Sequence, residues 1–214
     1  MSLSSALSIE ITDLGKRFNR HWVFRHINYT FNFNNSYAVI GYNGSGKSTL
    51  LQVLAGAVSK SQGTITYKIG DKIIPEENHF KYLSIATPYI ELIEELTLTE
   101  FLEFHHQFKP LMPQFTIPQL IDLVGLTAAT GKQIRYFSSG MKQRVKLLQA
   151  IFSNSPLVLL DEPTSNLDKA GIELYNQLIQ DYCLQNRLLI VCSNDENEIG
   201  FCNHRLDVTQ YKEV

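Results

Sequence analysis

Hydrophobic residues change their spacing along the chain, and the changes predict which elements form. In the N-terminal third, short stretches of alternating or β-branched apolar residues predict strands at 8–12, 27–31, 37–40 and 64–69. In the middle, LTEFLEFHHQF and IPQLIDLV repeat apolar residues every three or four positions, which predicts helices separated by proline and glycine. The first third is therefore strand-rich and the middle helical.

From residue 140 the pattern becomes helix, strand, helix, strand. The segments are GMKQRVKLLQAIF, PLVLLD, AGIELYNQLIQDYCL and LLIVC. Strands that are apolar throughout and alternate with helices predict a parallel sheet covered on both faces, which places the chain in the α/β class.

Composition narrows the class of protein. A length of 214 residues with 44% hydrophobic and 19% charged residues fits one globular domain. A net charge of −2 gives no large positive field for a nucleic-acid backbone or an anionic membrane, so we expect no nucleic-acid partner.

The cysteines and the N-terminus indicate a cytoplasmic protein. Three cysteines without C-x-x-C spacing indicate reduced thiols. The stretch MSLSSALSIE lacks a basic targeting region, and no apolar run approaches the roughly 18 residues of a membrane span. If this protein serves a membrane, we expect another chain to span it.

A phosphate-binding loop is predicted between a strand and a helix. The stretch AVIGYNGSGKSTLLQVLAG contains G-x-x-x-x-G-K-S, whose backbone N–H groups and helix N-terminus favour phosphate. Lys47 is expected to reach the β and γ phosphates and Ser48 to ligate Mg²⁺. The alternative is a plain glycine turn before a helix. The predicted ATP-binding residues of this loop are Gly41, Tyr42, Asn43, Gly44, Ser45, Gly46, Lys47, Ser48 and Thr49.

Two carboxylates follow a predicted buried strand in PLVLLDEP. Asp161 is expected to be the second anchor for Mg²⁺, and Glu162 to accept a proton from an attacking water. The alternative is that both acids only cap the next turn.

The segment FSSGMKQR lies about one helix before PLVLLDEPTSNLD, and this order of motifs resembles the ATP-binding-cassette (ABC) transporter ATPases. The resemblance covers nearly the whole chain. It implies a P-loop NTPase fold with a mostly parallel sheet, an N-terminal antiparallel β subdomain and an inserted helical subdomain. One domain would span 1–214, with a core at about 1–85 and 155–214 and the helical subdomain at about 90–150.

The resemblance also implies a composite site between two subunits. The family signature LSGGQ reads FSSGM here, and in the family this segment faces the γ-phosphate held by a second subunit. Two chains would then sandwich two ATP molecules head to tail. A plain serine N-cap is the alternative for this segment. The residues implied are Ser138, Ser139, Gly140 and Met141 of the signature, and Ser165 and Asp168 of the D-loop SNLD.

An aromatic residue usually stacks on adenine in this family. Phe18 in LGKRFNRHW stands at the matching place, with His21 and Trp22 as rivals. Packing of Phe18 under the sheet is the alternative.

Two departures from the family pattern concern catalysis. The family's Q-loop glutamine is absent from YLSIATPYIELIEELTLTE, where Ala86, Thr87 or Pro88 takes its place and only Thr87 offers a side-chain oxygen to the metal. The family's catalytic histidine is replaced by Asn194 in VCSND, which can hydrogen-bond phosphate but cannot carry a proton. We expect binding to survive better than turnover, unless Asn194 only turns the chain.

The function implied is ATP hydrolysis to ADP and phosphate by a peripheral subunit on the cytoplasmic face of a membrane. Its partners would be a second copy or a related ATPase subunit, and integral membrane transporter subunits. The chain lacks the long C-terminal extension of many importer subunits, which favours export. The alternatives are a soluble ATP-gated dimerisation switch with weak hydrolysis, and a non-transport ABC protein acting on ribosomes or DNA. The transported substrate and the choice between homodimer and heterodimer stay open.

Overall fold

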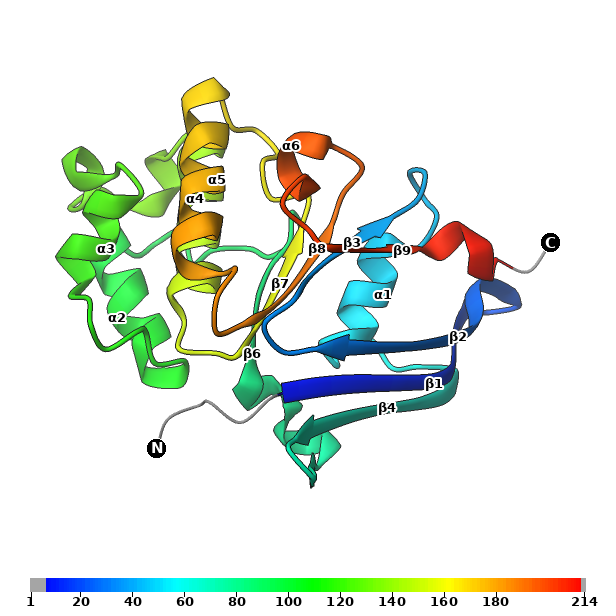
Figure 1. Cartoon of the computed structure of the whole chain (residues 1–214). Helices are drawn as coiled ribbons and strands as arrows, with labels where there is room; N and C mark the ends of the chain where they lie inside the picture. The colour runs from blue at the N-terminus through cyan, green and yellow to red at the C-terminus, as the bar shows by residue number, and fades with distance from the viewer. Residues whose placement is uncertain (1–6, 213–214) are drawn as a thin grey trace.

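The computed structural model describes residues 7–212, which fold around two β-sheets (Figure 1). Residues 1–6, part of the stretch in which no targeting signal was expected, lie outside the described residues, as do 213 and 214. Within residues 7–212, no helix is long and apolar enough to cross a membrane.

The larger sheet has five strands in the order β6-β7-β8-β3-β9, and all adjacent strands in it pair in parallel. Alternate residues of β7 enter two different cores: Val158 and Leu160 pack on one face, and Leu157 and Leu159 on the other. The predicted parallel sheet with two covered faces is confirmed. Its strands are β3 (Ser36–Ile40), β6 (Leu83–Ala86), β7 (Leu157–Asp161), β8 (Leu188–Cys192) and β9 (His204–Asp207).

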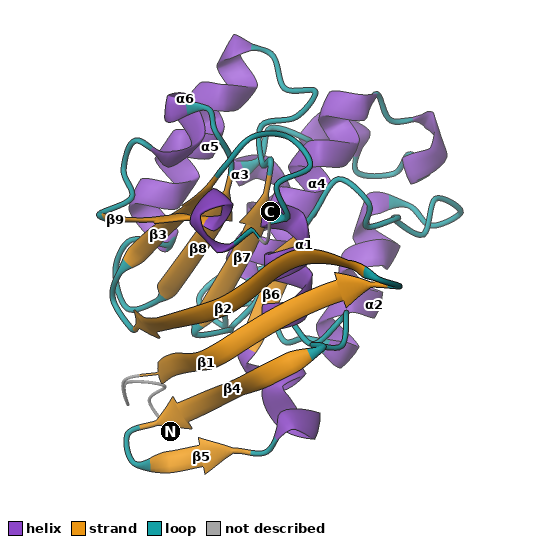
Figure 2. Ribbon diagram, turned by 90° about the vertical axis from the view of Figure 1, so that its right-hand side faces the viewer, coloured by secondary structure: helices purple, strands orange, loops and turns teal. Residues whose placement is uncertain are grey.

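The smaller sheet is antiparallel, in the order β2-β1-β4-β5. Helix α1 (Lys47–Leu54) packs between the two sheets (Figures 1 and 2). The first strands are longer than predicted, because the pairing of β1 with β2 shifts register between Ile11 and Leu14 and the apolar alternation breaks there. The strands are β1 (Leu7–Phe18), β2 (His21–Asn32), β4 (Gln62–Ile69) and β5 (Lys72–Ile74).

The predicted helices form, and two of them gather at one end of the molecule. Thr97 and Glu100 close a capping box that starts α2 next to its apolar run, since Thr97 N–H donates to the Glu100 carboxylate at 2.8 Å. The helices are α2 (Leu98–Phe108), α3 (Ile117–Leu123), α4 (Ser139–Phe152), α5 (Lys169–Tyr182) and α6 (Glu196–Ile199). The 3-10 helices are η1 (Glu76–Tyr82), η2 (Thr127–Ala129), η3 (Ile134–Tyr136) and η4 (Val208–Tyr211).

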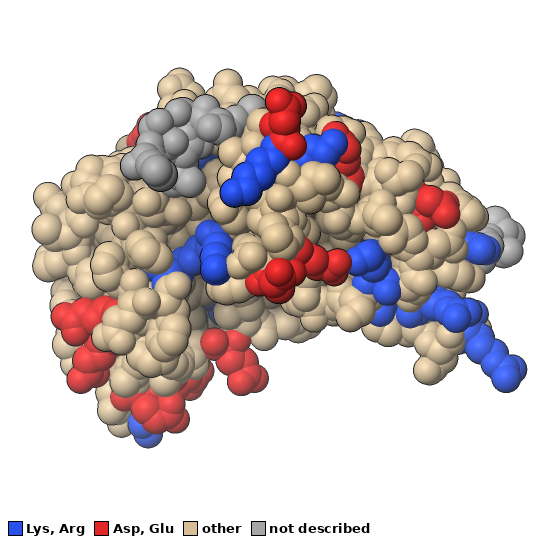
Figure 3. All heavy atoms as spheres, turned by 90° about the horizontal axis from the view of Figure 1, so that it is seen from below, with Lys and Arg blue, Asp and Glu red and all other residues tan. Residues whose placement is uncertain are grey.

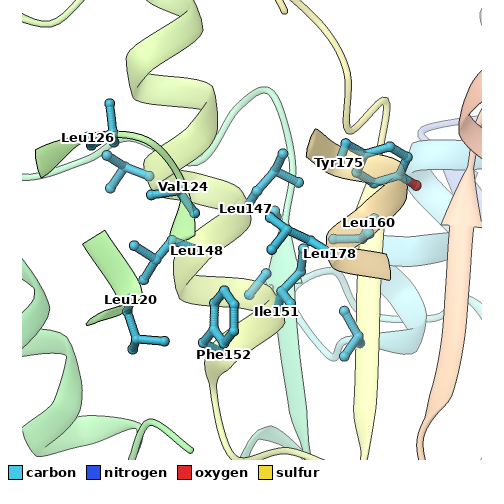
Figure 4. Packing of buried hydrophobic residues seen from close by; sticks show 14 of the residues in the cluster. Leu120, Val124, Leu126, Leu147, Leu148, Ile151, Phe152, Leu160, Tyr175 and Leu178 are labelled. Atoms are coloured by element: carbon cyan, nitrogen blue, oxygen red, sulfur yellow. The ribbon is translucent and has the colours of Figure 1, made fainter. Parts of the chain in front are cut away.

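Helix α4 joins the helical end to the parallel sheet. Figure 4 shows Leu148 of α4 beside Leu120 of α3, while Leu147 of α4 lies near Leu160 of β7 and Leu178 of α5. At the C-terminus of α4, the buried Arg187 guanidinium donates to the carbonyls of Ile151 and Ser153. The helix is therefore held along its length and at its end.

The surface carries charges of both signs, as the composition predicted. On the face in Figure 3, acidic and basic side chains are mixed, with acids gathered at the end where Figure 1 places α2 and α3. The α/β class with a mostly parallel sheet, an antiparallel β unit and inserted helices is confirmed.

Candidate functional site

A hollow of about 550 Å³ opens where the phosphate-binding loop meets the end of β7. This volume lies in the range of about 300–1,000 Å³ that small-molecule sites occupy. Two lining residues, Val23 and Tyr89, belong to no motif. The predicted site residues that line the hollow are Phe18, Asn43, Gly44, Gly46, Lys47, Ser48, Thr49 and Glu162.

The loop folds as its glycines require. Gly46 has a φ of 108°, and a Cβ there would stand 2.5 Å from the Val23 side chain. Gly41 has a φ of 145°, and its Cβ would stand 2.6 Å from Ser45 Oγ. Because only glycine fits both positions, the chain curls tightly between β3 and α1 and turns the N-terminus of α1 toward the hollow.

Lys47 is the cation of this loop. It is 6% exposed, and its Nζ donates to the carbonyl oxygen of Gly41 at 2.6 Å and to that of Tyr42 at 3.5 Å. A phosphate in the loop would offer this ammonium a charged acceptor, which makes the stronger hydrogen bond.

Gly41, Tyr42 and Ser45 form the back of the loop and do not line the hollow. The exposed Tyr42 ring lies 4.4 Å from the Lys212 ammonium. Ser45 is buried, and its Oγ has no hydrogen-bond partner among the described residues.

Asp161 ends β7 beside Ser48. The residue is 2% exposed and its carboxyl group hydrogen-bonds the Ser48 side chain, while Oδ1 has no partner among the described residues. Burial raises the pKa of Asp161 to about 6, and the hydrogen bond from Ser48 opposes that rise.

This pair of oxygen ligands fits Mg²⁺. Within residues 7–212 no group of three or more His, Cys, Asp or Glu side chains forms a metal cluster by itself. Mg²⁺ typically takes one or two protein ligands and completes its shell with water and substrate phosphates. The unpartnered oxygen of Asp161 beside the Ser48 hydroxyl matches that requirement.

Glu162 is held in a backbone conformation that is rare for its type. Its φ is 44°, and its N–H donates to Cys192 O at 3.0 Å. Non-glycine residues in this region cluster at functional sites, where surrounding contacts maintain them. The turn leaves the carboxylate exposed and facing the hollow.

Of the three aromatic candidates, Phe18 alone lines the hollow. It is 52% exposed, so it does not pack under the sheet. Trp22 instead lies against the guanidinium groups of Arg17 and Arg25, at 5.4 and 4.5 Å. His21 is exposed and lies outside the lining.

Thr87 and Asn194 lie beside the hollow rather than in its lining. The Thr87 side chain is 4% exposed. The Asn194 amide pairs with the backbone of Gly41: Gly41 N–H donates to Oδ1 at 3.1 Å, and Nδ2 donates to Gly41 O at 2.7 Å. Asn194 thus ties the end of β8 to the start of the phosphate loop.

The signature residues line a second hollow that shares no residue with the first. Ser138 caps α4, since Met141 N–H donates to its Oγ at 3.2 Å, so the plain N-cap geometry is present too. Asp168 of the D-loop lines the same hollow and caps α5 through Gly171 N–H at 2.8 Å. Ser165 lies outside both linings, and its N–H donates to Glu162 O at 3.1 Å. One chain therefore presents two separate hollows, one lined by the phosphate loop and one by these signature residues.

The sequence contained only a weak sign of the two missed residues. Val23 follows Trp22 in a strand, and nothing in the neighbouring sequence indicates that it lines the site. Tyr89 follows a proline after an apolar stretch, which predicts a turn but not its direction. The three cysteines are free thiols, as expected.

Comparisons with known proteins agree with this geometry. The family model described as "ABC transporter" matches residues 24–165. The ABC transporter ATP-binding protein YybJ of Bacillus subtilis (strain 168) is 30% identical over 201 residues, covering 94% of this chain and 92% of that protein. The cytochrome c biogenesis ATP-binding export protein CcmA of Rhodopseudomonas palustris (strain BisB5) is 33% identical over 157 residues, covering 73% and 76%.

A solved bacterial ABC transporter cassette, described as dimeric, has the same fold, with a TM-score of 0.77 at 19% identity over 94% of this chain and 95% of that chain. The family match spans most of the chain and contains the phosphate loop and the Asp161–Glu162 pair. The chain therefore belongs to the family of ABC transporter ATP-binding proteins.

Proposed function

We propose that this protein binds ATP and hydrolyses it to ADP and phosphate as the ATP-binding subunit of an ABC transporter. The observation that carries the proposal is the shared hollow in which Lys47, Ser48 and Glu162 converge beside the buried Asp161. A cation, a hydroxyl, a metal-binding carboxylate and a general base are the groups that phosphoryl transfer to water requires.

Each side chain has a distinct task in this reaction. Lys47 and the N–H groups at the start of α1 hold the phosphates. Glu162 accepts the proton of the attacking water at its carboxylate. Ser48 and Asp161 would hold Mg²⁺, which neutralises charge that develops on the phosphate oxygens when it is bound.

The second half-site supports a dimer. Ser138, Gly140 and the N-terminus of α4 line a hollow of their own, which contains no phosphate loop. A helix N-terminus with a serine hydroxyl favours an anion. We propose that it receives the γ-phosphate held by a partner, either a second copy or a related ATPase subunit in a head-to-tail pair. The dimeric cassette of the same fold supports this arrangement.

The transporter assignment rests on the relatives. YybJ is named as an ABC transporter ATP-binding protein, and CcmA as an ATP-binding export protein of cytochrome c biogenesis. We propose that the dimer lies on the cytoplasmic face of the membrane. Its ATP-driven opening and closing would drive transport through separate integral membrane subunits. Such subunits would supply the contacts to the transported substrate.

The test is steady-state phosphate release by the purified chain with Mg²⁺ and ATP. The wild type is expected to release phosphate, and Glu162→Gln to bind ATP without releasing it. Glu173→Gln on the exposed face of α5 is the matched control and should turn over like the wild type. Equal turnover by Glu162→Gln and the wild type would refute the general-base role. Affinity capture from detergent-solubilised membranes, with no integral membrane protein recovered, would count against the transport role.

One observation supports a second candidate, an ATP-gated dimerisation switch with weak hydrolysis. The Asn194 amide is hydrogen-bonded to the backbone N–H and carbonyl of Gly41, and it can neither carry nor relay a proton. A stable ATP-bound dimer without phosphate release, measured by light scattering and a phosphate assay, would favour the switch.

A further inference from the structure

Tyr89 is an exposed aromatic side chain that no motif accounts for. It is 75% exposed, yet it lines the same hollow as Lys47, Ser48 and Glu162. An aromatic ring left in water at the mouth of a polar hollow is available to a ligand that enters it.

The pairing of β6 with β7 brings the turn that carries Tyr89 out of the sheet beside Asp161 and Glu162. Strand β6 runs parallel to β7 with Ala86 opposite Leu160, so the chain leaving β6 starts level with Asp161. Tyr89 comes three residues after Ala86, close to the level of Glu162. Phe18, which also lines the hollow, comes from the end of β1 in the other sheet.

The turn that carries Tyr89 is fixed from both sides. Ile90 N–H donates to Thr87 O at 3.3 Å, which closes a four-residue turn with Pro88 and Tyr89 at its centre. Proline at the first central position presets the backbone of such a turn. Lys146 of α4 donates to Pro88 O at 2.8 Å, so the turn is also anchored to the signature helix.

We propose that the Tyr89 hydroxyl donates a hydrogen bond to the terminal phosphate of bound ATP. This inference rests on the proposed function and names a contact within the same site. The phenol is a neutral donor and acceptor, so it can donate to a phosphate oxygen without adding charge. Because it lies level with Glu162, its partner is the phosphate that leaves, which ADP does not have.

The contact distinguishes two nucleotides. A hydrogen bond from the phenol to a charged phosphate oxygen is lost when the terminal phosphate is absent. Losing a hydrogen bond to a charged group corresponds to roughly a tenfold change in the binding constant or more. Tyr89 therefore favours ATP over ADP by about that factor.

The experiment measures calorimetric dissociation constants for ADP and for a non-hydrolysable ATP analogue with a β,γ-methylene bridge, both with Mg²⁺. The variant is Tyr89→Phe, which removes the hydroxyl alone. Tyr136→Phe is the matched control, because Tyr136 is 72% exposed and lies outside the hollow. Thermal unfolding of both variants verifies that they fold.

Tyr89→Phe is expected to weaken binding of the ATP analogue about tenfold, leave ADP binding unchanged and reduce the maximal rate of ATP hydrolysis. Tyr136→Phe should leave all three quantities at the wild-type values. An unchanged ratio of analogue to ADP affinity in Tyr89→Phe would overturn the proposal, because it would place the hydroxyl away from the terminal phosphate. A wild type that binds neither nucleotide would instead refute the proposed function, and this contact with it.

Discussion

Replacing Asn194 by alanine removes both hydrogen bonds between the end of β8 and the phosphate loop. Gly41 loses an acceptor for its N–H at 3.1 Å and a donor to its carbonyl at 2.7 Å. The net contribution of one such bond is about 0.5–1.5 kcal/mol, so the pair contributes about 2 kcal/mol. Lys47 still donates to Gly41 O, which keeps that oxygen satisfied.

The assay is thermal unfolding of the nucleotide-free protein. A loss of about 2 kcal/mol lowers the melting temperature of a chain of this size by roughly 4–8 °C. Asn197→Ala is the control: it removes a side chain of the same type whose Nδ2 donates to Asp195 Oδ1 at 2.9 Å and does not touch the loop. Equal melting temperatures of Asn194→Ala and Asn197→Ala would refute the stabilising role of the two hydrogen bonds between Asn194 and Gly41.

Asn194→His separates the stabilising hydrogen bonds to Gly41 from any effect of residue 194 on catalysis. The two ring nitrogens of histidine point in different directions, so an imidazole cannot serve the N–H and the carbonyl of the same residue, Gly41, together. We expect this variant to melt below the wild type and to hydrolyse ATP faster, because imidazole can relay a proton. The missing donor or relay typically costs about 2.7–4 kcal/mol of transition-state stabilisation. Hydrolysis that is unchanged or slower would show that Asn194 does not limit turnover.

Four further predictions concern other parts of the chain. Phe18→Ala should weaken ATP binding by about 1–3 kcal/mol in a fluorescent-nucleotide titration, as loss of ring stacking on a base does, while Trp22→Ala leaves it unchanged. Arg187→Met should lower the free energy of unfolding in urea by about 2 kcal/mol or more, since the buried carbonyls of Ile151 and Ser153 each lose a hydrogen bond from a charged donor. Burial lowers the pKa of His105 from 6.5 to about 4. Between these pH values the His105 imidazole is therefore protonated in the unfolded chain and neutral in the folded chain. Stability should therefore fall between pH 6.5 and 4, and His105→Gln should flatten that fall. Chelation of Mg²⁺ should abolish phosphate release, measured as loss of signal on EDTA addition, if Asp161 and Ser48 hold the ion.

Sequence reasoning predicted well where a local rule determines the backbone. The phosphate loop is one case: Gly41 and Gly46 need backbone angles that other residues avoid, and the strand and helix around them follow from apolar spacing. The helix at 98–108 is another, since its apolar period and its Thr97–Glu100 capping box coincide. The long first strands were cut short in the prediction because bulges break their alternation.

The positions of individual side chains depended on contacts between distant segments. Asn194 and Gly41 are 153 residues apart in the sequence. They come together because β3 and β8, the strands that precede them, are adjacent in the sheet. Tyr89 faces the hollow because β6 pairs with β7, and β6 carries no strong strand signal of its own. Thr87 offered the required oxygen by residue type alone, but the turn after β6 buries that side chain and leaves Tyr89 exposed.

The residues that line the two hollows are connected through helix α4, although the hollows share no residue. Gln143 of α4 is buried and donates to Pro163 O at 2.7 Å, next to Glu162. Lys146, one turn further along α4, donates to Pro88 O at 2.8 Å, next to Tyr89. Helix α4 thus holds both turns that border the hollow, while its N-terminus carries the signature residues. Because its apolar side chains are packed against the parallel sheet, α4 fixes the signature relative to Glu162 and Tyr89 of the same chain.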